Sequence, residues 1–386
     1  MASTFVGGSA NDGLNIGAAT KFNYADEVRG EIMVDDNNNC FIVSSTLSND
    51  FPTTTNAFQK TIGGALDAVV FKMDNNLTTL VWSTYLGGTL NDAGYAMELD
   101  KKGDIDLTGG TAYTDLDNKA GTLQTTFQGG QADGFISHLS ANGSNLLHST
   151  YWGTTSYDQS YFVELDRSNN VHVFGQTQHN GSFFINNALY NKVGGGQFVS
   201  KLTPELDSVI WSTAFGSGNG AINISPTAFL VDVCSKMYLS GWGGTVNSTG
   251  NTVGMDVTAT PPDTVYDKTT DGSDFYLMVL EDDASKLFYA TYFGSPTGAE
   301  HVDGGTSRFD RNGRVYQSVC ASCGGDQNFP ITPGAHSSSN NATAGGRCNN
   351  GVFKFDLNLP IVIADFVTPP IACTPSTHTF THLSKG

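Results

Sequence analysis

"LVWSTYLGGTLNDAGYAMELDKKGDIDLTGGT", residues 80–111, contains two motifs that recur along the chain. In this segment an apolar run ends in Gly-Gly, a polar stretch follows, and two β-rich runs flank "DKKGD". The first motif, "STYLGG" at Ser83, returns in related form at Ser3, Ser149, Ser212 and Ala290. This recurrence predicts a protein built from repeat units that begin near residues 3, 83, 149, 212 and 290.

The second motif aligns without gaps over fourteen positions, and its copies start at Met33, Glu98, Glu164, Leu230 and Arg308. The third position is aspartate in every copy: Asp35, Asp100, Asp166, Asp232 and Asp310. An aspartate side chain accepts hydrogen bonds from backbone N–H groups two residues further on, so we predict a structural turn at this position. No copy matches the calcium-loop pattern D-x-[DN]-x-[DN]-G followed by glutamate. Calcium is possible but has no motif to support it, and no cofactor is expected.

A third motif, "DAVVFKM" at Asp67, stands sixteen residues before "STYLGG", and the same offset recurs in three later units. Within one unit, four short runs of apolar and β-branched residues are bounded by turn residues: 69–73, 80–86, 95–99 and 105–109. Four-stranded units of 60 to 80 residues without a helical period predict an all-β fold, a β-propeller.

The two ends of the chain suggest how the ring closes. The last "DAVVF"-type run, at Asn350, is not followed by a "STYLGG" run, and the missing run stands at the N-terminus as "STFVGG". We therefore predict five four-stranded blades, closed by pairing of Ser3–Gly8 with the strand Val352–Leu357, because closure hides the sheet edges. The alternative is a larger ring in a longer natural chain with further repeats upstream.

Composition limits the partners. The chain of 386 residues has 19 basic and 37 acidic residues, a formal charge of −18, which disfavours nucleic acid and anionic lipid surfaces. No apolar run is long enough for membrane insertion, and residues 1–10 lack the pattern of a signal peptide. The even number of cysteines, six, favours an oxidising compartment.

The motifs "STYLGG", "DFPTTTNAFQ", "GGALDAVVFKM" and "GGQADGFISHLSANGS" resemble SBBP-type β-propeller repeats of large secreted or cell-surface proteins of Bacteroidota. The resemblance covers residues 1–358, and residues 359–386 resemble a linker and the truncated start of a PKD-like module. It implies a fragment of a longer protein exported by the type IX route, as gliding-motility proteins are. It also implies an extracellular location and neighbouring modules of the same parent chain as partners.

The fourth and fifth units depart most from the repeat, so we expect binding residues there: Trp242, His301, Asp303 and Arg308. The alternatives are a buried indole and a structural His–Asp pair. In the fifth unit, Cys320 and Cys323 precede Cys348, which suggests a disulfide from either of the first two to Cys348. A zinc site completed by His336 is the alternative.

These features together predict a non-enzymatic scaffold or adhesion module that presents loops to a glycan or a surface protein. A polysaccharide-binding propeller is the second hypothesis. The third is a five-bladed glycoside hydrolase or lyase. The recurring acids fall in predicted turns, and no G-x-S-x-G motif occurs, so the expectation is that the chain is not an enzyme. Two or more carboxylates converging in the central funnel would favour the third hypothesis instead.

Overall fold

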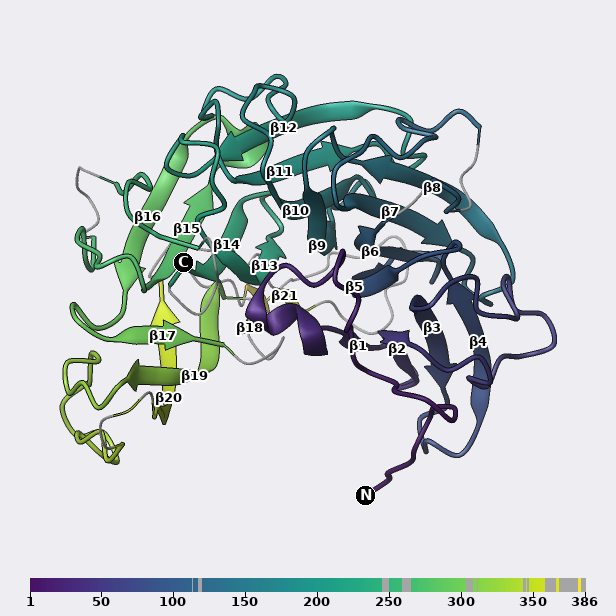
Figure 1. Ribbon diagram of the computed structural model, residues 1–386, viewed down its shortest axis with the longest axis horizontal. Coiled ribbons are helices and arrows are strands. Elements are labelled where there is room, and N and C mark those ends of the chain that lie inside the picture. The colour runs from purple at the N-terminus through teal and green to yellow at the C-terminus, as the bar shows by residue number, and fades with distance from the viewer. Residues whose placement is uncertain are drawn as a thin grey trace.

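The computed structural model describes residues 1–112, 114–116, 120–244, 250–258, 265–302, 308–310, 312–342, 345, 347–357, 366–367 and 381–382. Five antiparallel sheets surround a central axis (Figure 1). The prediction of an all-β propeller with five four-stranded blades is confirmed. In the described residues, helical structure is limited to two short 3₁₀ turns, η1 (Tyr24–Val28) and η2 (Asp282–Ala284). Neither is long and apolar enough to cross a membrane.

Each of the first four blades has its strands in chain order from the axis outward (Figure 1). The first blade contains β1 (Glu31–Val34), β2 (Cys40–Thr46), β3 (Asp67–Met73) and β4 (Leu80–Leu86). The second contains β5 (Asp92–Leu99), β6 (Ile105–Thr111), β7 (Asp133–Leu139) and β8 (Leu146–Trp152). The third contains β9 (Asp158–Leu165), β10 (Val171–Thr177), β11 (Gln197–Leu202) and β12 (Val209–Phe215). The fourth contains β13 (Ser225–Val231), β14 (Met237–Trp242), β15 (Phe275–Leu280) and β16 (Leu287–Phe293).

The fourteen-residue motif forms the hairpin between the two inner strands of a blade. In the first blade, Asp35 Oδ1 accepts hydrogen bonds from the backbone N–H groups of Asn37 and Asn39, each at 2.9 Å. The aspartates of the other copies accept the same pair of bonds from residues two and four positions further on. The repeated aspartates therefore lie in turns, where they fix the geometry of each inner hairpin.

Tryptophans of the outer strands fill the space between neighbouring blades. Trp82, Trp152 and Trp211 are each at most 5% exposed. Trp82, for example, belongs to a buried cluster that joins β2 and β3 of the first blade to β5, β6 and β7 of the second. These blade-to-blade layers, rather than a single core, hold the ring together.

Loops cover the outer edges of the first four blades. Thr54 and Gln59 make backbone hydrogen bonds with β4, and Gln124 makes one with β8. Equivalent loop residues bond to β12 and β16. Covering an edge strand satisfies its free N–H and C=O groups and blocks pairing with other chains.

The fifth blade is built differently. It contains β17 (Ala299–His301), β18 (Arg308–Phe309), β19 (Arg314–Cys323) and β20 (Asn349–Asp356), and both β17 and β18 pair with β19. Within the described residues, β20 pairs with β19 alone. The inner position is thus shared by two short strands, and β20 is the outermost strand.

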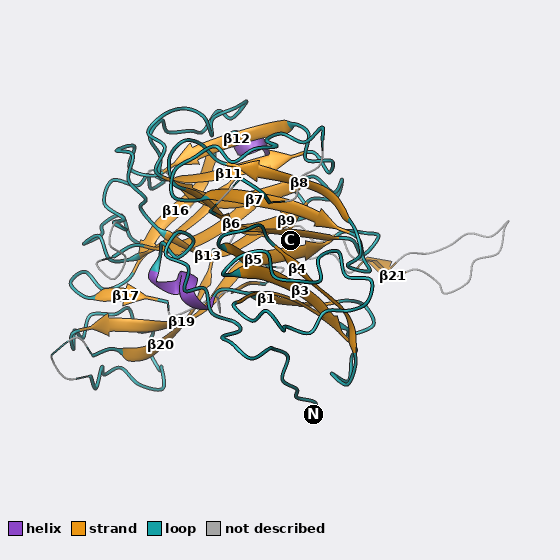
Figure 2. Ribbon diagram, turned by 45° about the vertical axis from the view of Figure 1, so that its right-hand side comes forward, coloured by secondary structure: helices purple, strands orange, loops and turns teal. Residues whose placement is uncertain are grey.

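The predicted clasp between Ser3–Gly8 and Val352–Leu357 is wrong. Hydrogen bonds with Asp50 and Ser48 hold residues 9–10 against the first blade, and residues 1–7 form no strand. Figures 1 and 2 both show the N-terminal segment apart from β20. The physical reason is that the backbone N–H groups of Gly8, Ser9 and Ala10 already bond to side chains of Asp12, Asp50 and Ser48 beside the first blade.

Residues 15–29, here called the axial segment, connect the blades instead. Asn15 and Thr20 hydrogen-bond to Tyr95 on β5, at 3.0 and 2.6 Å. Asp26 accepts a bond from Tyr161 on β9, and Arg29 donates to the carbonyl of Pro226 on β13. The segment therefore ties the inner strands of the second, third and fourth blades together at one end of the axis.

Beyond the fifth blade, β21 (Phe366–Val367) pairs with β22 (Thr381–His382). The rest of the segment predicted as a linker and PKD-like module lies outside the described residues.

Candidate functional site

A cavity of about 330 Å³ on the propeller axis, here called the central cavity, collects charged side chains from several blades. Inner strands of all five blades line it: β1, β5, β9, β13 and β18. Its polar groups are Glu31, Glu98, Glu164 and Arg308, and its other lining side chains are mainly apolar. Four blades thus each contribute one charged side chain to the same space.

The axial segment does not line this cavity but meets the inner strands further along them. It bonds to Tyr95 and Tyr161, which precede Glu98 and Glu164 by three residues on β5 and β9. Three residues of strand span about 10 Å. The axis is therefore filled at one end by the axial segment, and the glutamates face the other end.

Arg308 pairs with one of the three glutamates. Its Nη1 lies 2.6 Å from Glu31 Oε1, and the Met97 N–H donates to Glu31 Oε2 at 3.0 Å. Both oxygens of Glu31 thus accept a hydrogen bond, and hydrogen bonds of this kind favour the ionised form of a carboxyl group.

Burial raises the pKa of all three glutamates, but to different extents. It raises the pKa of Glu164 well above the usual value, and the charges of Glu98 and Glu31 add to this effect. Burial, with the charge of Glu31 adding to it, raises the pKa of Glu98 to about 7. Burial also raises the pKa of Glu31, and Arg308 opposes that rise. Neighbouring carboxylates therefore reinforce the rise in the pKa of Glu164, whereas the Arg308 guanidinium opposes the rise in the pKa of Glu31.

The predicted binding residues are placed in different surroundings. Arg308 lines the central cavity. Trp242 is completely buried, and its ring lies 5.9 Å from that of His301, so it faces protein and is not a stacking platform for a sugar. His301 is 8% exposed and also contacts Tyr24 of η1. Asp303 lies outside the described residues.

The cysteines of the fifth blade form one disulfide. Cys323 and Cys348 are bonded, and they close a loop between β19 and β20. The His301 Nδ1 lies 3.7 Å from Cys323 Sγ. A cysteine in a disulfide is not a thiolate ligand, so zinc bound through all three thiols does not fit this geometry.

The glutamates of the cavity were missed by sequence reasoning. Glu98 and Glu164 occupy the first position of the fourteen-residue motif, where the other copies have Met33, Leu230 and Arg308. Three of the five copies thus have a charged residue at a position where the other two have methionine and leucine, and this was the available signal. Glu31 lies two residues before that position, so no alignment of the repeats points to it.

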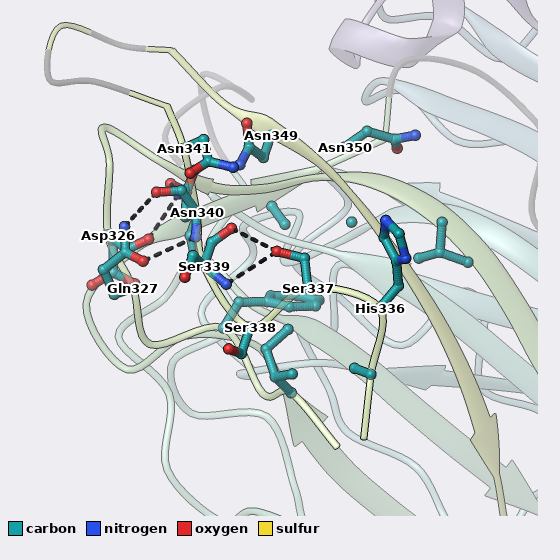
Figure 3. A pocket seen from close by; sticks show the side chains of 17 residues that line it. Asp326, Gln327, His336, Ser337, Ser338, Ser339, Asn340, Asn341, Asn349 and Asn350 are labelled. Carbon is teal, nitrogen blue, oxygen red and sulfur yellow. Dashed lines mark hydrogen bonds between the residues drawn. The ribbon is translucent and has the colours of Figure 1, made fainter. Parts of the chain in front are cut away.

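A second cavity, of about 400 Å³, lies in the fifth blade beside the loop that the disulfide closes (Figure 3). Its lining is rich in serine and asparagine, and much of this polar surface is bonded internally. Asn340 donates to the carbonyls of Ser322 and Asp326, and Gln327 donates to the carbonyl of Asn340. This cavity has no converging carboxylates, so the central cavity is the stronger candidate.

No protein-family model matches the chain, and no curated protein matches it in sequence. The resemblance to SBBP-type repeats therefore stays a prediction. Solved structures with a related fold include a PL25 ulvan lyase, 12% identical, with a TM-score of 0.42 over 94% of this chain and 78% of that one. A GH43 β-xylosidase/α-arabinofuranosidase from a compost microbial metagenome is 12% identical, with a TM-score of 0.36 over 82% and 90%. A Dyadobacter fermentans protein of unknown function is 11% identical, with a TM-score of 0.40 over 84% and 74%.

The expectation that the chain is not an enzyme is corrected. It assumed that the acids lie in turns, yet Glu31, Glu98 and Glu164 converge on the central cavity. The arrangement in the cavity is one that acid–base chemistry can use.

Proposed function

We propose that the protein is a carbohydrate-active hydrolase that acts on neutral polysaccharide chains in the central cavity. The observation that supports this most strongly is the convergence of three glutamates and one arginine from four blades on one cavity. Hydrolysis of a glycosidic bond needs one carboxylic acid that gives a proton and one carboxylate that acts as nucleophile or base.

The surroundings of each glutamate suggest its role. Burial and the charges of Glu98 and Glu31 raise the pKa of Glu164 and so favour its protonated form, which makes it the proposed general acid that protonates the leaving oxygen. Glu31 is bonded to Arg308 and to the Met97 N–H, so it is the proposed carboxylate that attacks the sugar or activates water. Glu98 lies between them in blade order, and its charge adds to the rise in the pKa of Glu164.

Hydrolysis is favoured over elimination by the charge of the cavity. A lyase that acts on a uronic acid must neutralise the substrate carboxylate. Arg308 is the only cation among the described residues that line this cavity, and it is already paired with Glu31. With Arg308 paired in this way, the described lining offers no unpaired positive charge to an anionic sugar, so a neutral sugar fits better.

The shape and walls of the cavity also suit a sugar. Phe162, Phe229 and Phe309 provide apolar surface for the C–H face of a pyranose. Because the axial segment fills the far end of the axis, the cavity would admit the end of a polysaccharide rather than its middle. We therefore expect release of short products from chain ends.

An extracellular location is part of the proposal. The Cys323–Cys348 disulfide supports it, because such bonds persist in oxidising compartments. The resemblance to repeats of secreted proteins points in the same direction.

The proposal is tested by incubating the protein with a panel of neutral polysaccharides and measuring reducing ends. We expect activity on at least one polymer, and Glu164→Gln should lower kcat about 100-fold or more, because general acid catalysis contributes about 10²–10⁴-fold. The wild-type rate should fall as the pH rises through the pKa of Glu164, since the acid then loses its proton.

Glu281→Gln is the matched control. Glu281 pairs with Lys236 outside the central cavity and should not affect the rate. Equal activity of wild type and Glu164→Gln would refute the assignment of the acid. Binding of a polysaccharide without any turnover would instead support the second hypothesis, a binding propeller.

A further inference from the structure

A second cluster of charged groups lies at the inner hairpin of the second blade. One ligand atom each from Asp100, Asp104 and His138 lies within 4.8 Å of the others. They line a cavity of about 250 Å³ that Lys102, His148 and Glu205 also border. This cavity lies between the second blade and Asn169, Pro204 and Glu205 of the third, and it shares no lining residue with the central cavity.

The free atoms of the cluster point toward one another. Asp104 Oδ1 accepts the Ala141 N–H at 2.7 Å, which leaves its Oδ2 3.9 Å from His138 Nε2. Asp100 Oδ1 accepts two turn N–H groups, and its Oδ2 accepts one long hydrogen bond, of 3.5 Å, from the Asn169 side chain. One oxygen of each aspartate is therefore available on the side of the histidine.

Asp106 sets the orientation of the histidine. His138 Nδ1 lies 2.9 Å from Asp106 Oδ1, and the Asp106 side chain is 3% exposed. A proton on Nδ1 that is donated to this carboxylate would leave Nε2, which lies 3.9 Å from Asp104 Oδ2, as the ring nitrogen that can bind a metal. A carboxylate behind a histidine in this way is the usual outer partner of a metal-binding imidazole.

The first and third blades, here called the sister blades, can be compared with the second, because the strand register identifies the equivalent positions. In the first blade, Asn39 donates to Oδ2 of Asp35 at 2.9 Å, and Lys72 lies 3.0 Å from the same oxygen. The third blade repeats this with Asn170 and Lys201 on Asp166, at 2.8 and 3.1 Å. Both blades thus use an amide donor and an ammonium to satisfy the turn aspartate.

In the second blade, both of these donors are replaced by residues whose side chains can bind a metal ion. Asp104 stands where the sister blades have asparagine, and His138 stands where they have lysine. A third carboxylate, Asp106, stands where they have Phe41 and His172. Three aspartates therefore surround one histidine, and the hairpin has lost the lysine that balances the charge in the sister blades.

We propose that Asp100, Asp104 and His138 bind one divalent transition-metal ion, with Asp106 as the positioning residue behind the histidine. Ligands of one such ion lie about 3–4 Å apart, given bonds of about 2.0–2.2 Å, so small rotations of the side chains complete the site. Mixed imidazole and carboxylate ligands favour zinc or a similar ion over calcium or magnesium. The remaining coordination positions face the cavity.

The test uses the full chain, freed of metal with a chelator, and titrates it with Zn²⁺ in a calorimeter. We expect one Zn²⁺ per chain at this site and a rise in unfolding temperature on binding. Asp106→Asn should weaken binding about 10- to 100-fold, which is the usual effect of losing an outer partner.

The matched variant is Asp104→Asn/His138→Lys, which gives the second blade the residues of the first and third. It should fold with an unchanged unfolding temperature in the absence of metal and should lose the calorimetric signal. Cys320→Ser is a second control, because Cys320 belongs to a separate group of possible ligands with His301. Unchanged Zn²⁺ binding in the double variant would overturn the proposal. So would the absence of binding by the wild type at 100 µM to 1 mM, which is roughly the weak end of metal affinities. Tighter binding of Ca²⁺ than of Zn²⁺ would also overturn it.

Discussion

Arg29 and Asp26 form an ion pair inside the protein, with side chains only 4% and 0% exposed. Arg29 also donates to the carbonyl of Pro226 at 2.7 Å and lies 4.5 Å from the ring centre of Tyr161. One pair thus connects the axial segment to the third and fourth blades. Removing one partner of a buried pair leaves an uncompensated charge, which is costly.

We therefore expect Arg29→Met to lower the free energy of unfolding by about 3–5 kcal/mol. Asp26→Asn/Arg29→Met should be less destabilised than the sum of the single variants, because no lone charge remains. Urea denaturation of the four proteins measures this coupling. Lys21→Met is the control, since Lys21 and Glu27 form an exposed pair worth less than about 1 kcal/mol. A cost for Arg29→Met no larger than that for Lys21→Met would contradict the role given to the axial segment.

Sequence reasoning succeeded for residues whose role is local. The turn aspartates could be predicted because each bonds to N–H groups two and four residues away. It failed for Trp242, whose burial depends on the neighbouring fifth blade. Arg308 was singled out for its closeness in sequence to His301, but its partner is Glu31, which is far away in the chain.

At the scale of the element, β20 stands out because its outer edge has no partner among the described strands. Val352 on this strand is 75% exposed. The outer strands of the other four blades are covered by loops that bond to their backbones. An uncovered edge favours pairing with a second chain.

We expect the protein to self-associate through β20 at high concentration, and Val352→Lys to reduce this, because a charge on an edge strand opposes pairing. Light scattering coupled to gel filtration measures the change in mass with concentration. Val81→Lys is the matched control, since Val81 is also exposed but lies on the covered strand β4. If both variants associate like the wild type, β20 is not the associating edge.

The strands themselves could be predicted from the repeats. The expected runs 69–73, 80–86, 95–99 and 105–109 correspond to β3, β4, β5 and β6, which extend the first, third and fourth runs by two or three residues. The split inner strand of the fifth blade could not be predicted, because both of its pieces depend on pairing with β19. The axial segment belongs to no repeat, so its position follows only from the assembled ring.

At the scale of the whole molecule, acidic groups dominate the response to pH. Burial raises the pKa of Asp92 to about 7, of Asp133 to about 8 and of Glu300 to about 9. A carboxyl group with a raised pKa in the folded state stabilises the protein when the pH is below its pKa in the unfolded chain, near 4. This stability is lost as the pH rises through its pKa in the folded protein. The pKa of Asp35 is lowered instead, to about 2, so the stability that Asp35 contributes is lost only below about pH 4.

We therefore expect the unfolding temperature to be highest near pH 5 and to fall toward pH 8. Relief of repulsion within a chain of charge −18 acts in the same direction on acidification. Thermal unfolding followed across this range tests the prediction. Asp133→Asn should flatten the slope by up to about 1.4 kcal/mol per pH unit. A protein more stable at pH 8 than at pH 5 would show that these carboxyl groups are ionised in the fold.

The prediction of five blades was correct because repeat number fixes the number of sheets. The manner of closure was not predictable from the repeats, since the N-terminal run looks like a strand whether or not it reaches β20. The same limit applies to the central cavity. Its glutamates lie on three different blades, and only the closed ring brings them together.

The claim that the central cavity hydrolyses glycosidic bonds is tested most directly by the fate of solvent oxygen. The reaction is run in ¹⁸O-labelled water with a neutral polysaccharide that the protein degrades, and the products are analysed by mass spectrometry. We predict one ¹⁸O atom at each new reducing end with the wild type, and a rate at least about 100-fold lower with Glu164→Gln. Unsaturated products without ¹⁸O, or labelled products formed equally fast by the variant, would contradict the account.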